Sequence, residues 1–346
     1  MFYFNQQPGR TVMIEGEAYL FFSGYAYLGM SYVPEFVQLV KEGIDKYGVL
    51  FPSSRVSNTR LPLYNAFEEK LAALTRMEAC ISFSSGYLSG QVAAAVLSHH
   101  PHLFISPQAH PAVIPPGMKP RFNTDDWENR LLDYVHTEKP AEIALITDSI
   151  NTGTGAVHSF SFLEQIPDPV KVICLVDDSH GIGLLGTNGE GILTQLPQRE
   201  NIEYVISCSL SKAFHLEGGA ICCSAAFAAT VRKQATYAAS TAIMPAFMHS
   251  FMQADDLYRK QRLKLMANIS SLAEKLKDLS YVNHYGLPIF VLPGSLTEDE
   301  FKPFKIIISS FGYPNPGDPK NNRVVVSALH TAEDLTAVAN SIRRLY

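Results

Sequence analysis

Hydrophobic residues in the middle of the chain occur in short continuous runs rather than in strict alternation with polar residues. Short β-branched runs, separated by longer segments with helical periodicity, are typical of buried parallel strands joined by helices. The pattern therefore predicts an α/β fold with a mixed, mainly parallel sheet. The expected strands cover residues 79–83, 103–105, 143–146, 170–176, 204–206 and 220–223.

The clearest helical pattern lies between residues 62 and 77. Leu63, Phe67, Leu71 and Leu74 recur there at spacings of four, four and three. This spacing places all four side chains on one face of a helix. We therefore expect a helix that packs this face against the sheet.

After about residue 245 the pattern changes to a long helical stretch that continues through residue 279. A small α+β unit is expected to follow it, and Thr331 begins a Thr-Ala-Glu-Asp sequence that suits the N-terminus of a last helix. The expected elements of this unit are a strand at 288–292, a helix at 297–311, a strand at 323–327 and the closing helix from Thr331.

Length and composition limit the classes of protein that fit. The 346 residues suggest about two domains, and 47% hydrophobic with 18% charged residues argues against a disordered chain. With 28 Lys and Arg against 33 Asp and Glu, the net charge is −5. Because no block of like charge occurs, nucleic acid and anionic membranes are not expected partners.

Targeting and cysteine patterns point to the cytoplasm. The N-terminus has no basic region leading into an apolar run, so no secretory signal is expected. The uncharged stretch 234–254 contains many polar residues, which favours a buried segment of a globular protein over a membrane helix. The five cysteines include no C-x-x-C pair, so reduced thiols in the core are expected.

An acidic residue stands at the end of the expected strand 170–176. Ligands of parallel α/β sheets bind beyond the carboxyl ends of the strands, and Asp177 occupies such a position. A turn or helix cap is the alternative explanation for this residue. Asp177 is therefore a candidate functional residue.

The same segment partly fits two other kinds of site. Gly181, Gly183 and Gly186 fit the G-x-G-x-x-G pattern of dinucleotide sites, but four residues separate them from the strand and no helix follows. Asp177, Asp178 and His180 include metal-ligand residue types, but consecutive residues at a strand end point to opposite faces and no further ligands are evident. No metal is expected.

Two further segments fit the chemistry of a phosphorylated cofactor. Lys212 follows a buried strand among small and apolar residues, and poor solvation lowers the pKa of an amine and makes it a better nucleophile. Ser85 and Gly86 lie between a strand and a helix, where free N–H groups suit a phosphate. With Asp177, which precedes Lys212 by 35 positions, these features match the needs of pyridoxal phosphate (PLP).

At these residues the chain resembles fold-type I PLP enzymes, and among them the α-oxoamine synthases, the family of 8-amino-7-oxononanoate synthase and glycine C-acetyltransferase. The resemblance rests on Asp-x-x-His at 177–180 and Ser-x-Ser-Lys-Ala-Phe at 209–214. It implies the aspartate aminotransferase-like fold of PLP-dependent transferases. The implied large domain spans 48–241, and the small α+β domain is formed by 1–47 and 242–346.

The resemblance also implies roles around the cofactor ring. Lys212 would bind PLP covalently and shuttle the Cα proton. Asp177 would pair with the pyridinium nitrogen, and His180 would hydrogen-bond the phenolic oxygen. His110 matches the histidine that stacks on the ring face.

Phosphate contacts are implied in the same way. Ser85, Gly86 and Tyr87 match the family's S-G-Y loop beside the phosphate, and Ser209 matches a hydroxyl ligand just before the lysine. Thr241, in Ser240-Thr241, matches a residue that reaches the phosphate of the neighbouring subunit. A homodimer is therefore expected, with the active site at its interface and between the two domains.

Two residues are implied to face the substrate. Thr152 falls on the family's active-site serine, and Arg323 matches the arginine that binds the carboxylate of the amino acid. A guanidinium suits this task because it can donate two parallel hydrogen bonds to a carboxylate.

Departures from the family pattern lie around the substrate. Ala26 stands where the family has an Asn that helps hold the carboxylate, residues 47–55 replace a glycine-rich stretch, and His215 replaces a glycine. The resemblance implies condensation of an amino acid with an acyl-CoA. A PLP-dependent aminotransferase of the same fold is the alternative, and a non-catalytic protein that keeps the fold is a third possibility.

Overall fold

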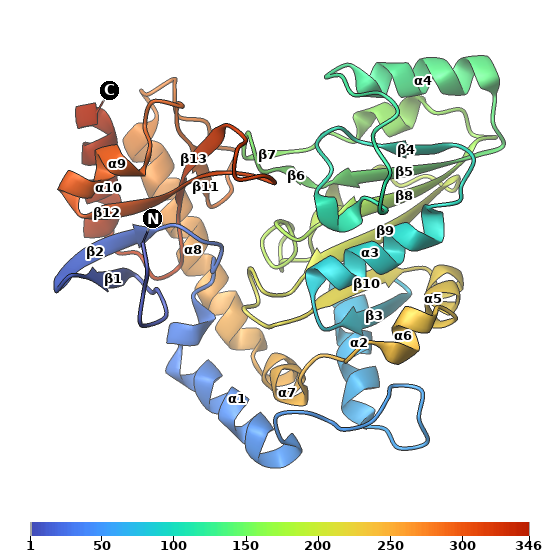
Figure 1. Cartoon of the computed structure of the whole chain (residues 1–346), viewed down its shortest axis with the longest axis horizontal. Coiled ribbons are helices and arrows are strands. Elements are labelled where there is room, and N and C mark those ends of the chain that lie inside the picture. The colour runs from blue at the N-terminus through green and yellow to red at the C-terminus, as the bar shows by residue number, and fades with distance from the viewer. Residues whose placement is uncertain (1, 346) are drawn as a thin grey trace. The chain divides into compact units, whose positions relative to one another are not determined.

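The computed structural model describes residues 2–345, which divide into two compact units (Figure 1). The larger unit covers residues 38–150 and 158–254. The smaller unit comprises the described parts of 1–37, 151–157 and 255–346. Compared with the expected domain boundaries, residues 38–47 and 242–254 group with the larger unit, and residues 151–157 group with the smaller unit.

A six-stranded sheet forms the centre of the larger unit. Its order is β3-β10-β9-β8-β5-β4; the neighbours β4, β5, β8 and β9 are parallel, and β10 runs antiparallel to β9 and β3. All six strands expected from the sequence are confirmed, as is the mixed, mainly parallel sheet. Their bounds are β3 Ala79–Phe83, β4 Leu103–Ile105, β5 Glu142–Asp148, β8 Lys171–Asp177, β9 Ile202–Ser209 and β10 Gly219–Cys223.

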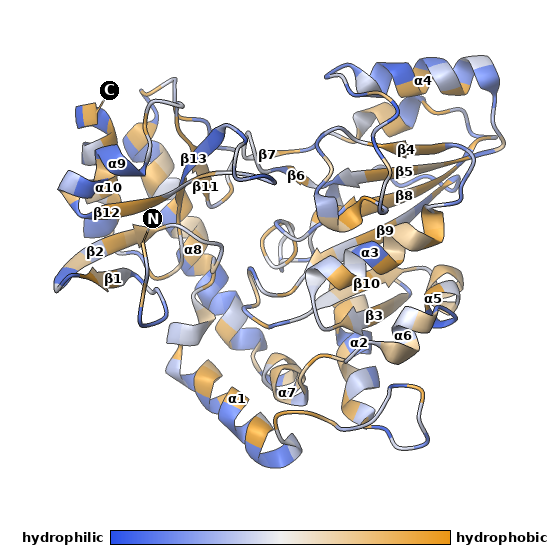
Figure 2. Cartoon of the chain, viewed as in Figure 1, coloured by the Kyte–Doolittle hydropathy of each residue, from blue (hydrophilic) through white to orange (hydrophobic). Residues whose placement is uncertain are grey.

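The hydrophobic runs form strands because the larger sheet is apolar along its length. Figure 2 shows β4, β5, β8 and β9 as mostly hydrophobic, whereas helix α4 (Trp127–Glu138) is mostly hydrophilic. Ile146, Leu175 and Val205 lie on adjacent strands and are completely buried. They belong to one core cluster with the apolar faces of helices α3 (Gly86–Leu97) and α5 (Ala225–Arg232), as expected for parallel strands that are covered by helices.

The helix expected at 62–77 is confirmed as α2, which begins with Pro62 at its first position and ends where Arg76 adopts a left-handed conformation. In the uncharged stretch 234–254 the structure has two helices, α6 and α7. The helices of the larger unit include α2 Pro62–Thr75, α3 Gly86–Leu97, α4 Trp127–Glu138, α5 Ala225–Arg232, α6 Ala235–Ala239 and α7 Pro245–Gln253. Helix α1 (Pro34–Tyr47) precedes them.

The smaller unit contains a five-stranded sheet in the order β1-β2-β12-β13-β11. Strands β1 and β2 form a hairpin that the sequence analysis did not predict; its turn residues Glu15 and Gly16 both have positive φ, as the commonest two-residue turns require. The strands are β1 Thr11–Ile14, β2 Glu17–Phe22, β11 Ile289–Val291, β12 Ile306–Gly312 and β13 Lys320–Val325. The short strands β6 (Ile150–Asn151) and β7 (Ala156–Val157) make a separate two-stranded sheet.

The helix expected at 297–311 is wrong over most of its length. Helix α9 covers only Glu298–Phe301, a 3-10 turn follows at Lys302–Phe304, and Lys305 then adopts a left-handed conformation with φ of 55°. Strand β12 begins at the next residue and pairs with β2 and β13. Three consecutive isoleucines at the start of β12 are buried there, which outweighs the helical spacing.

The long helical stretch expected through residue 279 consists of two helices. Helix α7 ends at Gln253, Ala254 leaves the helical conformation, and α8 covers Asp255–Leu276. The closing helix is confirmed as α10 (Ala332–Leu345). Thr331 accepts a hydrogen bond from the Asp334 N–H (3.4 Å), and the Asp334 carboxylate accepts one from the Thr331 N–H (2.8 Å).

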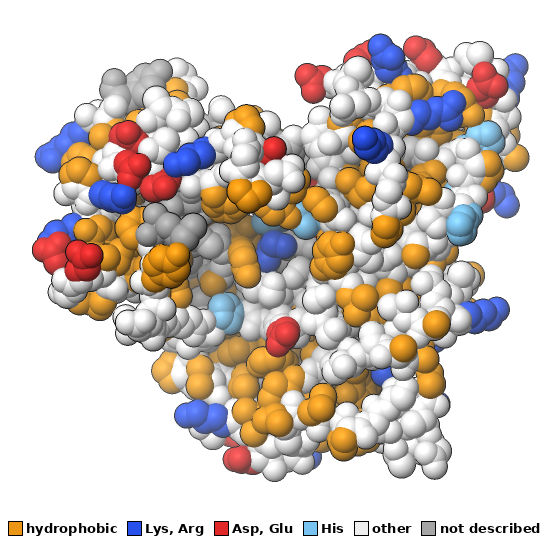
Figure 3. Space-filling model, viewed as in Figure 1, with side chains coloured by type: hydrophobic (Ala, Val, Ile, Leu, Met, Phe, Trp, Pro, Cys, Tyr) orange, Lys and Arg blue, Asp and Glu red, His pale blue; other side chains and the backbone are white. Residues whose placement is uncertain are grey.

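The remaining expectations concern the surface and the thiols. All five cysteines are buried and reduced, as expected. On the face shown in Figure 3, basic side chains are interspersed with acidic and uncharged ones. Among residues 2–345, the helices are all too short or too polar to cross a bilayer.

Candidate active site at the carboxyl end of the larger sheet

Two carboxylates end neighbouring strands of the larger sheet. Asp177 is the last residue of β8, Asp148 is the last residue of β5, and the two are paired in register. Lys212 lies in the loop that follows β9, the strand on the other side of β8. The sheet therefore gathers an amine and two acids at its carboxyl end, where α/β proteins bind ligands.

Lys212 is poorly solvated, as the sequence predicts. Burial lowers the pKa of its amine, while the neighbouring carboxyl groups of Asp177 and Asp148 oppose this effect. A lowered pKa increases the fraction of neutral amine, which is the form that attacks a carbonyl. Lys212 thus has the environment of a nucleophilic lysine.

His110 joins the same cluster from the loop after β4. Its Nδ1 accepts the main-chain N–H of Ala112 (3.1 Å) and lies 3.9 Å from Oδ2 of Asp177. Burial lowers the pKa of His110; Asp177 opposes this shift and Lys212 adds to it. Because Nδ1 accepts an N–H, the neutral ring carries its proton on Nε2.

Asp177 is fixed by the turn that follows it. Its Oδ1 accepts the N–H of Ser179 (2.9 Å), and the Ser179 hydroxyl accepts the N–H of Ser209 (2.8 Å). These bonds connect the end of β8 to the segment that leads to Lys212. His180 is the next residue in this turn and is partly buried.

The N-terminus of α3 lies against this segment. Ser85 caps the helix by accepting the N–H of Leu88 (3.1 Å). A Cβ on Gly86 would come within 2.4 Å of the Cβ of Ser209, so only glycine allows this approach. The Ser209 hydroxyl and the first N–H groups of α3 are therefore neighbours, and an N-terminus of this kind suits a phosphate.

These residues fit PLP. The ligand needs a poorly solvated lysine, an acid for its ring nitrogen, and phosphate donors nearby. Lys212, Asp177 and the Ser209–Gly86 approach supply the three within one unit.

Asp178 has a structural role instead. It is completely buried, its Oδ2 accepts the N–H of Ile192 (2.9 Å), and burial raises its pKa to about 7. A Cβ on Gly181 or Gly191 would lie 2.0 or 2.2 Å from its carboxylate oxygens. Gly181 therefore makes room for Asp178. No group of three metal-ligating side chains gathers anywhere within residues 2–345.

Arg323 and Thr152 belong to the smaller unit. Nη1 of Arg323 donates to the main-chain oxygen of Thr152 (3.3 Å), while Nε is buried and makes no hydrogen bond within the described residues. Burial lowers the pKa of Arg323, and the neighbouring Tyr27 opposes this shift. The arginine therefore has donor capacity left for an anionic group.

Tyr87 and Thr241, the other two expected ligands, are exposed residues of the larger unit. Tyr87 lies in the first turn of α3 with 60% of its surface exposed, and Thr241 follows α6. The described contacts do not link either side chain to the Lys212 cluster.

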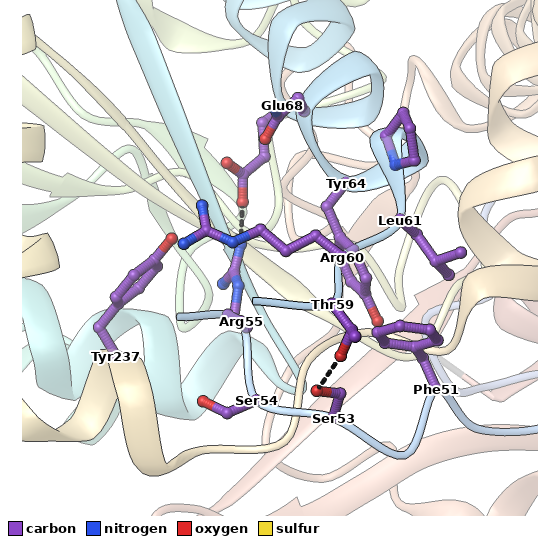
Figure 4. A pocket seen from close by; sticks show the side chains of 12 residues that line it. Phe51, Ser53, Ser54, Arg55, Thr59, Arg60, Leu61, Tyr64, Glu68 and Tyr237 are labelled. Atoms are coloured by element: carbon purple, nitrogen blue, oxygen red, sulfur yellow. Dashed lines mark hydrogen bonds and ion pairs between the residues drawn. The ribbon is translucent and has the colours of Figure 1, made fainter. Parts of the chain in front are cut away.

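A cavity of about 230 Å³ lies elsewhere in the larger unit (Figure 4). Two of its lining residues, Arg55 and Glu68, form an ion pair, and both side chains are at least 90% buried. Arg55 also donates to the main-chain oxygen of Ser82. Its guanidinium lies 4.7 Å from the ring centre of Tyr237. The segment that replaces the family's glycine-rich stretch is thus held against β3 by Arg55. The lining residues are Phe51, Ser53, Ser54, Arg55, Thr59, Arg60, Leu61, Pro62, Tyr64, Asn65, Glu68 and Tyr237.

Comparison with known proteins identifies the family of this chain. The family model described as aminotransferase class I and II matches residues 25–342. The chain belongs to this family. The resemblance to PLP-dependent α-oxoamine synthases stated from the sequence is confirmed.

Named relatives and solved structures support the same placement. An 8-amino-7-oxononanoate synthase from Buchnera aphidicola is 25% identical over 97% of this chain and 91% of its own length. One from Thermosipho melanesiensis is 26% identical over 94% and 88%. A serine palmitoyltransferase from S. paucimobilis with a bound PLP–myriocin aldimine has a TM-score of 0.82 at 17% identity, covering 99% of this chain and 91% of that one. An 8-amino-7-oxononanoate synthase from Francisella tularensis has a TM-score of 0.70 at 22% identity, covering 94% and 97%. At these identities the two structures establish the fold, which is that of PLP-dependent transferases.

Sequence reasoning missed Asp148. The expected strand 143–146 stops two residues before it, whereas in the structure Asp148 ends β5 beside the end of β8. With these bounds, the rule that selected Asp177 applies to Asp148 as well. The order of the strands was the missing information, because only neighbouring strands bring their ends together.

Proposed function

We propose that this PLP-dependent transferase condenses an amino acid with an acyl-CoA, as an α-oxoamine synthase does. The observation that carries the proposal is Lys212, a poorly solvated amine at the carboxyl end of the sheet that interacts with Asp177. The names of the relatives support this reaction class.

Several residues of the larger unit would each have a different role toward the cofactor. PLP, when bound, supplies an electron sink for the pair of electrons left on the substrate's Cα. Asp177 would hold a proton at the ring nitrogen, and His180 would donate to the phenolic oxygen. Lys212 would hold the cofactor and move the Cα proton, while His110 would cover one face of the ring and exclude water.

Other residues would bind the charged groups. Ser85, Gly86, Tyr87 and Ser209 would hold the phosphate through a hydroxyl and the N-terminus of α3. In the smaller unit, Arg323 would bind the substrate carboxylate, with Thr152 beside it.

A homodimer is part of the proposal. Thr241 is exposed and would reach the phosphate site of a second copy. Light scattering of the purified protein tests this assembly; a monomer that retains full activity would contradict it.

An aminotransferase of the same fold is the second candidate. Ala26 lacks the amide that the family uses on the carboxylate, and His215 adopts a left-handed φ of 58° at a position where the family has glycine. Both changes lie outside the cofactor residues, so they bear on the substrate rather than on PLP.

Product analysis separates the candidates. Each standard amino acid is incubated with the PLP-loaded protein and either an acyl-CoA or a keto acid. Release of free coenzyme A supports condensation, whereas conversion of the amino donor to a keto acid without thiol release would replace it by transamination. Exchange of the Cα proton with deuterated water is followed in parallel by NMR. If no amino acid exchanges this proton, a non-catalytic protein is indicated.

A further inference from the structure

Asp148 and Asp177 are register partners at the ends of adjacent strands. Neighbouring strands lie about 4.8 Å apart, so two carboxyl groups face one small volume. Like charges at this separation oppose each other's ionisation. One of the two acids is therefore expected to keep its proton.

The surroundings favour Asp148 as the protonated member. Burial and the charge of Asp177 raise the pKa of Asp148 well above its usual value; the His110 N–H and, from the loop after β9, Lys212 oppose this shift. Asp177 accepts the Ser179 N–H with one oxygen and faces the His110 ring with the other.

Asp148 also holds the main chain of His110. Its Oδ1 accepts the His110 N–H at 2.9 Å. The residues after His110 are anchored differently, because the side-chain amide of Gln91 on α3 donates to the main-chain oxygens of Pro111 and Ala112 (both 3.0 Å). Asp148 is thus the link between this loop and the central sheet at the residue whose ring enters the site.

We infer that Asp148 is a positioning residue of the cofactor site: it fixes His110 through the main-chain N–H and, kept neutral, leaves the negative charge of the strand ends on Asp177. This inference rests on the proposed use of PLP. Asp148 itself touches no reacting atom in this arrangement. A neutral side chain with a carbonyl oxygen at the same place would also accept the His110 N–H and so would position His110 equally well.

The test compares Asp148→Asn, Asp148→Ala and the control Asp133→Asn, which makes the same chemical change on an exposed residue of α4. Asparagine keeps the acceptor oxygen and has no charge, whereas alanine removes the acceptor. Two quantities are measured for each holoprotein: the dissociation constant of PLP and the pH midpoint of the visible absorption band of the lysine-bound cofactor. The melting temperature of each apoprotein is recorded as a measure of folding.

We expect Asp148→Asn and Asp133→Asn to bind PLP within about twofold of the unmodified protein and to keep its pH midpoint. Asp148→Ala should weaken PLP binding about tenfold, the loss expected for one hydrogen bond. Should the alanine variant fail to fold, Asp148→Ser replaces it, because its shorter side chain cannot reach the His110 N–H.

Three results would overturn the inference. A midpoint moved by a full pH unit in Asp148→Asn would mean that Asp148 is ionised. Unchanged PLP affinity in the folded alanine or serine variant would mean that His110 is positioned without it. The absence of any band in the unmodified protein with added PLP would remove the proposed function as well, and so is distinguishable from the other two.

Discussion

Two clusters of side chains each contain a poorly solvated cation, but different groups surround it. The Lys212 cluster, in the larger unit, consists of Lys212, Asp177, Asp148 and His110. The Arg323 cluster, in the smaller unit, consists of Arg323, Thr152 and Phe311. Lys212 interacts with Asp177 and Asp148, and His110 is placed beside them. Arg323 meets a main-chain oxygen of Thr152 and the ring of Phe311, with the ring centre 5.8 Å away. The first cluster contains acidic groups beside its cation, whereas no ion pair of Arg323 with a carboxylate is found among residues 2–345.

This difference separates two kinds of site. A buried cation without an opposite charge is costly unless a ligand supplies one, and the pKa of Arg323 is lowered accordingly. A bound carboxylate would offset this cost. In the Lys212 cluster, the neighbouring acids already offset part of the effect of burial on the pKa of Lys212. We therefore expect changes at Lys212 to affect chemistry and changes at Arg323 to affect substrate affinity.

The largest expected effect is that of Lys212→Ala. Without the amine, the protein loses the covalent cofactor link and at least about 1000-fold of its turnover, as is typical for a nucleophile. Borohydride reduction followed by mass analysis checks the link: the unmodified protein retains PLP covalently, and the variant does not. Covalent retention by the variant would assign the link to another lysine.

Arg323→Ala should raise KM for the amino acid about 100-fold, because a charge-assisted pair of hydrogen bonds is lost. The dissociation constant of PLP should not change. Measuring it beside KM therefore tests directly whether the Arg323 cluster serves the substrate and the Lys212 cluster serves the cofactor. Arg323→Lys serves as the matched variant, since it keeps the charge and loses the planar fork. Equal weakening of PLP and amino-acid binding would show that the two clusters are not separate in function.

Asp178 gives a smaller effect, on stability. Its pKa is raised from 3.8 to about 7, so the folded state holds this proton more tightly than the unfolded state. The free energy of unfolding should therefore fall as pH rises through this window. Relative to Asp178→Asn, which cannot titrate, the loss between pH 4 and pH 8 should be about 4 kcal/mol.

Urea unfolding of the apoprotein at several pH values measures this difference. Asp133→Asn is the control, because it makes the same chemical change on an exposed residue of α4. An Asp178→Asn variant with the same pH dependence as the unmodified protein would show that Asp178 is ionised when folded.

The smallest effect is expected for Thr331→Ala in the smaller unit. The change removes the side-chain acceptor at the N-terminus of α10 and should cost about 1 kcal/mol of unfolding free energy. Because the cap is a local feature, KM and PLP affinity should stay unchanged. A rise in KM would indicate that α10 supports the Arg323 cluster.

The local sequence pattern was sufficient to predict much of the larger unit and its cofactor. The apolar runs specify the strands of the larger sheet, because a buried strand must be apolar along its length. The spacing around Phe67 specifies α2, and the order of Ser85, Asp177 and Lys212 along strands and loops was enough to expect PLP. These features depend on neighbours in sequence.

Tertiary structure decided the rest. Strand β12 forms because β2 and β13 flank it, which the helical spacing at 297–311 could not indicate. Gly181 is required by the nearby Asp178 carboxylate rather than by a ligand. Asp148 becomes part of the site only through its register with Asp177. Each of these features depends on residues that are far apart in sequence. Periodicity can be recognised within one segment, whereas the pairing of strands depends on at least two segments and cannot be predicted from either one alone.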